Sequence, residues 1–166
     1  LGWSPFPLRR NTKSPPPSGV TGYNGERPDI AQVREWRQRK GSGNVALRLP
    51  ETVLGIDLDV YHGGLAAFQA AVDKWGPLPP TWASTARSDG SKTMFFRVPP
   101  GRVWADALDG GGVEIIHHGH RYSVVWPSTN PDNGGAVYGW LGPDGQPCFP
   151  PRVEQMPPLP ERWRDG

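Results

Sequence analysis

Proline is the residue that most restricts the structures open to this chain, because its ring fixes φ and removes a backbone N–H. The sequence holds 21 Pro and 22 Gly in 166 residues, and prolines are frequent in residues 1–28 and 143–166. We expect residues 1–28 to be loop and residues 143–166 to be a linker or a strap over the core. Eight Trp, five Phe and four Tyr indicate that the remainder folds around an apolar core.

Length and composition narrow the class of protein. A chain of this length predicts one domain, which we assign to residues 1–142, followed by a Pro-rich C-terminal strap or linker at residues 143–166. The single cysteine, Cys148, excludes an internal disulfide and a multi-cysteine zinc site, and it favours a reducing, cytoplasmic location. No apolar run reaches the roughly 18–20 residues of a membrane span, so we expect no membrane partner. A net charge of +2 permits a nucleic-acid partner without requiring one.

Hydrophobic spacing predicts two helices between the Pro-rich ends. Asp29 is placed to cap the first helix, in which Ile30, Val33 and Trp36 fall on one face. Gly63 and Gly64 open the second helix, and Gly76 followed by Pro77 ends it. The predicted inner face of the second helix consists of Leu65, Phe68, Val72 and Trp75.

Short runs of β-type residues predict strands around these helices. The runs cover residues 44–49, 53–59, 81–85, 93–98, 113–116 and 120–126. The turn at Gly119 is short enough to make the last two runs a hairpin. Two helices with a mixed or antiparallel sheet predict an α+β protein.

The pair Asp57 and Asp59 interrupts an apolar strand in the segment Val53–Val60. Residues i and i+2 of a strand face the same side, so their Cα atoms should be roughly 6–7 Å apart with both carboxylates projecting together. Two like charges side by side are costly in a core, and a divalent cation removes that cost. The alternative is an exposed edge or turn with solvated acids.

A second apolar strand, Val113–Ile116, carries one acid, Glu114. If this strand neighbours the first, Glu114 becomes a third carboxylate for the same cations. Three oxygen donors that leave positions open are typical of Mg²⁺ or Mn²⁺ sites that also bind triphosphate oxygens. If the two strands are not neighbours, Glu114 is an ordinary solvent-facing strand residue.

Two polar segments contain candidate phosphate ligands. One holds His117, His118 and His120 followed by Arg121, and it fits a phosphate site, a zinc site or a polar hairpin tip. The other is a Gly/Ser-rich turn from Ser88 into a strand, and it fits either a triphosphate site or a flexible loop. The second segment lacks the spacing of a P-loop.

The remaining basic and aromatic residues have two interpretations each. Arg34, Arg37, Arg39 and Lys40 lie on the outer side of the first predicted helix, as a template-binding face or a solvated one. The strand tryptophans pack in the core or stack on bases. These tryptophans are Trp82, Trp104, Trp126 and Trp140.

Several segments match a known family when taken as an ordered set. They are Gly2–Leu8, Asn44–Arg48, Asp57 with Asp59, Phe95–Pro99, Val113–Ile116 and Arg121–Ser128. Over roughly residues 2–141 the chain resembles the prim-pol (bifunctional DNA primase/polymerase) domain of the archaeo-eukaryotic primase superfamily. The closest resemblance is to versions from bacteriophages, plasmids and their actinobacterial hosts.

This resemblance implies an RRM-like catalytic sheet with a flanking α/β subdomain and Pro-rich terminal segments. It implies a template-dependent nucleotidyltransferase of phage or mobile-element replication, a DNA primase that is also a polymerase. Asp57, Asp59 and Glu114 would be catalytic and would hold two Mg²⁺ or Mn²⁺ ions. The partners would be a single-stranded DNA template, nucleoside triphosphates, and a helicase fused or in trans, at the replication fork of a bacterial cell.

Residue roles toward the two substrates follow from the same resemblance and from residue type. The expected nucleotide-binding residues are Arg48, Ser91, Lys92, Thr93, Arg97, His120 and Arg121, and the expected DNA-binding residues are Arg34, Arg37, Arg39 and Lys40. Thr93 stands where many members of the family have His, so Lys92 or His120 would replace that phosphate ligand. This departure favours one alternative, a non-catalytic module that binds nucleic acid or nucleotide on the same fold. A second alternative, a metal-dependent nuclease, rests on the same three acids.

Overall fold

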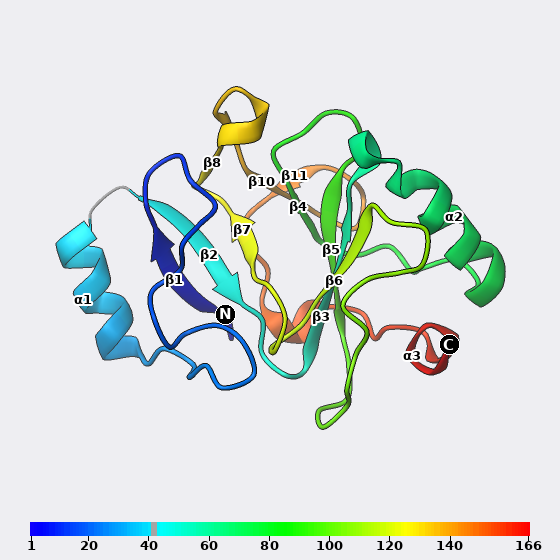
Figure 1. Cartoon of the computed structure of the whole chain (residues 1–166), viewed down its shortest axis with the longest axis horizontal. Coiled ribbons are helices and arrows are strands. Elements are labelled where there is room, and N and C mark those ends of the chain that lie inside the picture. The colour runs from blue at the N-terminus through cyan, green and yellow to red at the C-terminus, as the bar shows by residue number, and fades with distance from the viewer. Residues whose placement is uncertain (41–42) are drawn as a thin grey trace.

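The computed structural model describes residues 1–40 and 43–166, with α1 at one end of the molecule and α2 and the C-terminus at the other (Figure 1). The helices are α1 (Ile30–Lys40), α2 (Gly64–Trp75) and α3 (Glu161–Asp165), with short 3₁₀ helices η1 (Val60–His62), η2 (Pro131–Asn133) and η3 (Val153–Gln155). No helix in the described ranges combines the length and apolar character needed to cross a bilayer.

The strands form two larger sheets and one small pair. The strands are β1 (Ser4–Leu8), β2 (Asn44–Arg48), β3 (Val53–Leu58), β4 (Ala83–Thr85), β5 (Lys92–Arg97), β6 (Val113–Ile116), β7 (Ser123–Val125), β8 (Thr129–Asn130), β9 (Ala136–Val137), β10 (Gly139–Leu141) and β11 (Pro147–Cys148). One sheet has the order β1-β2-β7, the larger has the order β11-β10-β4-β5-β3-β6, and β8 pairs with β9. All of these pairings are antiparallel, which agrees with the predicted α+β class.

Successive side chains of β3 point to opposite faces of the large sheet, so its core residues and its acid lie on different faces. Ile56 and Leu58 point into a core beneath α2 that also contains Met94, Phe96 and Ile115. The opposite face of the large sheet carries a second core against β2 and β7, which includes Leu47, Leu49, Phe95, Ile116 and Trp140. Asp57 lies between Ile56 and Leu58 in sequence, so it projects from this second face.

The predicted N-terminal loop contains a strand. In β1, Ser4, Phe6 and Leu8 are buried while Pro5 and Pro7 are half-buried. β1 is an edge strand of its sheet, where a residue without an N–H is tolerated. The prediction of a loop was wrong because the two prolines occupy alternate positions of the strand, on its less buried face.

The predicted hairpin at Gly119 is also wrong. A single bridge between His117 and His120 closes the turn, and the chain then changes sheets. β6 pairs with β3, whereas β7 pairs with β2. Arg121 has a left-handed backbone, with φ of 63°, at the point where the two strands diverge.

Both predicted helices form, but their buried faces are shifted. The deepest residues of α2 are Gly64, Ala67 and Ala71, which allow close approach to the sheet, and Leu65 is 57% exposed. The other predicted inner residues, Phe68, Val72 and Trp75, are partly buried against the same core. In α1 the Asp29 carboxylate accepts a hydrogen bond of 2.8 Å from the Gln32 N–H, which confirms the cap. Ile30 is 65% exposed, so it does not belong to the packed face.

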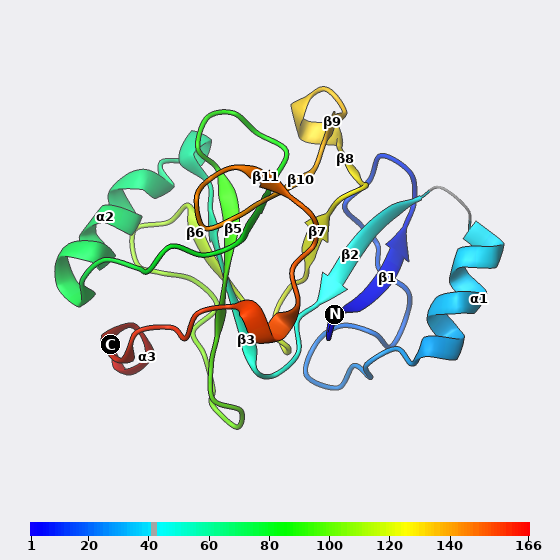
Figure 2. The same cartoon turned by 180° about the vertical axis from the view of Figure 1, so that it is seen from behind.

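The C-terminal segment crosses the sheets on the side seen in Figure 2. Val153 and Met156 enter the second core, and Leu159 and Trp163 enter the core beneath α2. The Leu159 N–H donates a 2.9 Å hydrogen bond to the carbonyl of Arg97 at the end of β5. Of the strand tryptophans, Trp140 is buried, Trp82 and Trp104 are half-buried, and Trp126 is 54% exposed.

Candidate active site

Three acids lie close together, two on neighbouring strands and one just after the end of a strand. Asp57 of β3 stands directly opposite Glu114 of β6 in the register, as predicted if the two strands are neighbours. Directly opposed residues have their side chains on the same face, about 4.5–5.5 Å apart at Cβ. Asp59 follows β3, and its N–H donates a 2.8 Å hydrogen bond to the carbonyl of Gly112, which extends the pairing.

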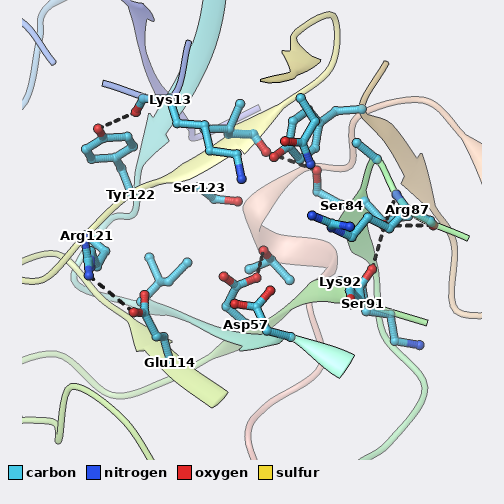
Figure 3. Close-up of a pocket in the computed structure, with 18 of the residues that line it drawn as sticks. Lys13, Asp57, Ser84, Arg87, Ser91, Lys92, Glu114, Arg121, Tyr122 and Ser123 are labelled. Carbon is cyan, nitrogen blue, oxygen red and sulfur yellow. Dashed lines mark hydrogen bonds and ion pairs between the residues drawn. The ribbon is translucent and has the colours of Figure 1, made fainter. Parts of the chain in front are cut away.

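A cavity of about 370 Å³ opens over these acids (Figure 3). Lys13, Arg87 and Arg121 bring positive charge to its lining. Hydroxyl groups line it as well, among them those of Ser84, Thr93, Tyr61 and Tyr138. The cavity therefore combines a floor of carboxylates with a cationic, hydroxyl-rich wall, an arrangement suited to a polyanion and the cations that accompany it.

Burial leaves the charge of Asp57 poorly compensated. Burial, together with the nearby charges of Asp59 and Glu114, raises the pKa of Asp57 to about 6. The Thr93 hydroxyl opposes this shift by donating a 2.6 Å hydrogen bond to Oδ1 of Asp57. A bound proton or cation would relieve the excess negative charge at this point.

The three acids are suited to divalent ions, both by the type of their donor atoms and because they line the same cavity. All of their donor atoms are carboxylate oxygens, the ligands that Mg²⁺ and Mn²⁺ prefer. The Glu114 carboxylate, however, is turned toward Arg121, with 3.3 Å between Oε1 and Nη2. Across the described ranges, no three His, Cys, Asp or Glu side chains stand close enough together to hold a metal ion as oriented.

Four of the predicted nucleotide-binding residues line the cavity: Ser91, Lys92, Thr93 and Arg121. The Ser91 hydroxyl is buried and accepts a 2.9 Å hydrogen bond from the Val60 N–H, so it holds η1 beside the acids. Lys92 pairs with Leu58, whose side chain points into the core beneath α2. Strand alternation therefore places the Lys92 side chain on the face opposite to Thr93.

The other three predicted nucleotide-binding residues do not line this cavity. The Arg48 guanidinium is buried and donates a 2.7 Å hydrogen bond to the carbonyl of Val20. Arg97, at the far end of β5, donates a 2.7 Å hydrogen bond to the carbonyl of Met156. The His120 ring lies 3.5 Å from the Asp106 carboxylate. All three contact other chain segments in the folded structure.

The histidine segment forms a compact contact outside the cavity. His117 is 2% exposed, and its Nε2 lies 3.2 Å from Oδ1 of Asp106. Burial lowers the pKa of His117, although Asp106 opposes the shift. The Tyr23 ring packs against His117 and His118, with centroids 5.8 and 5.7 Å away. These contacts close the turn between β6 and β7.

The predicted DNA-binding residues lie on α1, whose place at the far end of the molecule from α2 is clear in Figure 1. Arg34, Arg37 and Arg39 are exposed, and Arg39 forms a 3.0 Å ion pair with Glu35. None of these three arginines lines the cavity over the acids. The side chain of Lys40, the fourth predicted residue, is outside the described part of the chain.

Two cations of the cavity escaped the sequence analysis. Lys13 belongs to the segment predicted as an N-terminal loop, and Arg87 to the turn between β4 and β5. Arg87 packs its guanidinium 3.8 Å from the centroid of the Tyr61 ring. No short-range pattern marks either residue, because each reaches the cavity through packing between distant segments.

A comparison with models of known protein families gives a match over nearly the whole chain. The family model Prim-Pol, described as "Bifunctional DNA primase/polymerase, N-terminal", matches residues 1–162. No curated protein and no solved structure matches the chain. The matched range covers the three acids, the cationic wall of the cavity and most of the C-terminal segment.

Proposed function

Because the chain belongs to the bifunctional DNA primase/polymerase family, we propose that it is a nucleotidyltransferase that joins nucleotides on a single-stranded DNA template in phage or mobile-element replication. The observation that carries this proposal is the direct pairing of Asp57 with Glu114, beside Asp59, on the floor of a cation-walled cavity. In this proposal the large antiparallel sheet is the RRM-like catalytic sheet of the primase type. A helicase, fused or in trans, stays a prediction.

We propose that Asp57, Asp59 and Glu114 hold two Mg²⁺ or Mn²⁺ ions. When bound, such ions lower the pKa of a 3′-hydroxyl and neutralise the charge that develops on the triphosphate and the leaving pyrophosphate. The chain's own part is to orient the donors: the Thr93 hydroxyl fixes one oxygen of Asp57. Glu114 must leave Arg121 to face the other acids, which frees the Arg121 guanidinium for phosphate.

The cationic wall takes over the role that a histidine has in many members of the family. Thr93 carries no positive charge, and its hydroxyl already donates to Asp57. Lys13, Arg87 and Arg121 instead surround the space above the acids. Phosphate oxygens bound there would lie between these cations and the metal-binding carboxylates, as a nucleoside triphosphate requires.

The direct test is primer synthesis and extension on single-stranded DNA with Mg²⁺ or Mn²⁺. We expect both activities, and we expect EDTA to reduce them by ~10³-fold or more, because the ions supply several kcal/mol of charge stabilisation. Readdition of the metal should restore them. DNA binding without turnover or metal response would instead identify a non-catalytic module, and shortening of end-labelled DNA would identify a nuclease.

The arginines of α1 give a separate prediction about the template. If the exposed Arg34, Arg37 and Arg39 contact DNA phosphates, replacing all three by Ala should make the negative slope of log K against log [salt] shallower by about 2. Fluorescence anisotropy with single-stranded DNA at several salt concentrations measures this slope. An unchanged slope would show that α1 is a solvated face and that the template follows another path.

A further inference from the structure

The backbone of Lys13 is fixed at the rim of the cavity. The Tyr122 hydroxyl donates a 2.6 Å hydrogen bond to the carbonyl of Lys13, and the Asn44 amide donates a 2.8 Å hydrogen bond to the carbonyl of Thr12. Asn44 is 2% exposed, so this anchor is part of the folded core. These bonds use main-chain oxygens, which any residue at position 13 would supply. The Lys13 side chain is therefore not needed to hold its own segment in place.

The Lys13 side chain has a weak partner outside the cavity. Its Nζ lies 2.9 Å from Oδ2 of Asp132, in η2, and the two side chains are 35% and 62% exposed. Asp132 does not line the cavity, whereas Lys13 does. The Lys13 ammonium lowers the pKa of Asp132, so this partner is an anion at neutral pH. An exposed ion pair of this kind contributes little to stability and is easily exchanged.

Asp132 also contacts Arg87, the second cavity cation that the sequence analysis did not predict. Arg87 donates a hydrogen bond of 3.5 Å to the main-chain carbonyl of Asp132. Asp132 of η2 thus contacts Lys13 through its side-chain carboxylate and Arg87 through its main-chain carbonyl. Figure 3 shows Lys13 across the cavity from Asp57 and Glu114.

We propose that Lys13 binds the triphosphate of the incoming nucleotide and that Asp132 is an internal counter-anion, which pairs with Lys13 when no nucleotide is present. This inference rests on the proposed function. Nucleotide binding exchanges one exposed carboxylate for a polyphosphate with several negative charges, which a lysine ammonium binds as a point charge. Asp132 is therefore a competitor of the substrate and lowers its affinity.

The two members of the pair should give opposite effects, which a merely structural ion pair would not. Lys13→Ala is expected to weaken binding of dATP with Mn²⁺ about tenfold or more, the usual size for loss of a charge-assisted hydrogen bond. Asp132→Asn is expected to strengthen it about two- to fivefold, because only a surface ion pair is lost. The double variant should bind like Lys13→Ala, since Asp132 acts through Lys13.

The measurement is calorimetric titration with dATP and, separately, with inorganic triphosphate, which tests the phosphate contact without base or sugar. Arg10→Ala, an exposed arginine of the same segment, is the matched control and should leave both affinities unchanged. Thermal unfolding of each variant confirms that it is folded. If Lys13→Ala and Asp132→Asn change affinity in the same direction, or neither changes it, the proposal is wrong.

Steady-state extension separates this inference from the proposed function. Lys13→Ala should raise KM for the nucleotide, and Asp132→Asn should lower it. Normal extension by the wild type with an unchanged KM in Lys13→Ala would overturn the role of Lys13 alone. Absence of extension by the wild type, together with the expected opposite changes in triphosphate affinity, would overturn the proposed function and leave the exchange between Asp132 and phosphate standing.

Discussion

Asp57→Asn is expected to abolish primer extension and at the same time to stabilise the metal-free protein at pH 7. The carboxamide binds divalent cations poorly, so activity should fall by ~10³-fold or more. Stability should rise because the wild-type carboxylate is buried next to Asp59 and Glu114, which makes its ionised form costly. Asn is close in size and retains an oxygen that can accept the hydrogen bond from Thr93.

The sign of the stability change follows from the raised pKa of Asp57. The folded protein holds this proton up to a pH of about 6, whereas the unfolded chain releases it near the ordinary aspartate pKa of 3.8. The unfolded chain therefore binds fewer protons over this interval, and stability falls as pH rises through it. The accumulated cost above pH 6 is about 3 kcal/mol, and Asp57→Asn should remove most of it.

Urea unfolding in EDTA from pH 4 to pH 8 measures this effect. The gain in free energy of unfolding for Asp57→Asn should be near zero at pH 4, should grow through pH 5, and should level off above pH 6. Asp109→Asn changes an exposed acid outside the cavity and is the matched control, with no expected change in extension or in pH dependence. A loss of stability in Asp57→Asn at pH 7 would show that its carboxylate is well compensated in the folded protein.

The features that can be predicted from the sequence are those with a local signal. The spacing of Asp57 and Asp59 on an apolar strand depends only on the two-residue repeat of β structure, and the Asp29 cap depends only on the first turn of α1. The adjacency of β6 to β3 is non-local; the Val113–Ile116 pattern alone did not specify it, although the family resemblance did. The register then brought Glu114 opposite Asp57.

Which side chains line the cavity depends on long-range packing, which the sequence does not reveal. Arg48, Arg97 and His120 were chosen by residue type, but the type of a side chain does not determine its direction, and each contacts another part of the chain. Conversely, Lys13 was not predicted as a site residue, because its place over the cavity depends on contacts with Asn44 and Tyr122, which are far away in sequence. The turn at Gly119 has the length of a hairpin, but its two strands pair with different sheets.

Gly112→Ala is expected to destabilise the protein strongly, because it combines backbone strain with a steric clash beside the acids. Gly112 has φ of 70°, a left-handed backbone that costs an Ala residue about 1–2 kcal/mol. A Cβ there would also collide with the backbone nitrogen of Gly64, where α2 begins. Backbone atoms cannot yield as a flexible side chain can, so overpacking adds about 1–3 kcal/mol. The total expected loss in free energy of unfolding is therefore about 2–5 kcal/mol.

The same contact positions an acid, so activity should fall even in the molecules that stay folded. The carbonyl of Gly112 accepts from the Asp59 N–H, and the Asp59 carbonyl accepts a 3.0 Å hydrogen bond from the Gly64 N–H. Any separation of Gly112 from Gly64 therefore shifts Asp59 relative to Asp57. Gly111→Ala is the matched control, because Gly111 has a similar φ of 79° but a Cβ there would meet nothing within 4 Å. It should lose only about 1–2 kcal/mol and keep extension activity below its unfolding temperature. Equal losses in the two variants would mean that backbone strain, rather than the close approach of β6 to α2, dominates at this corner.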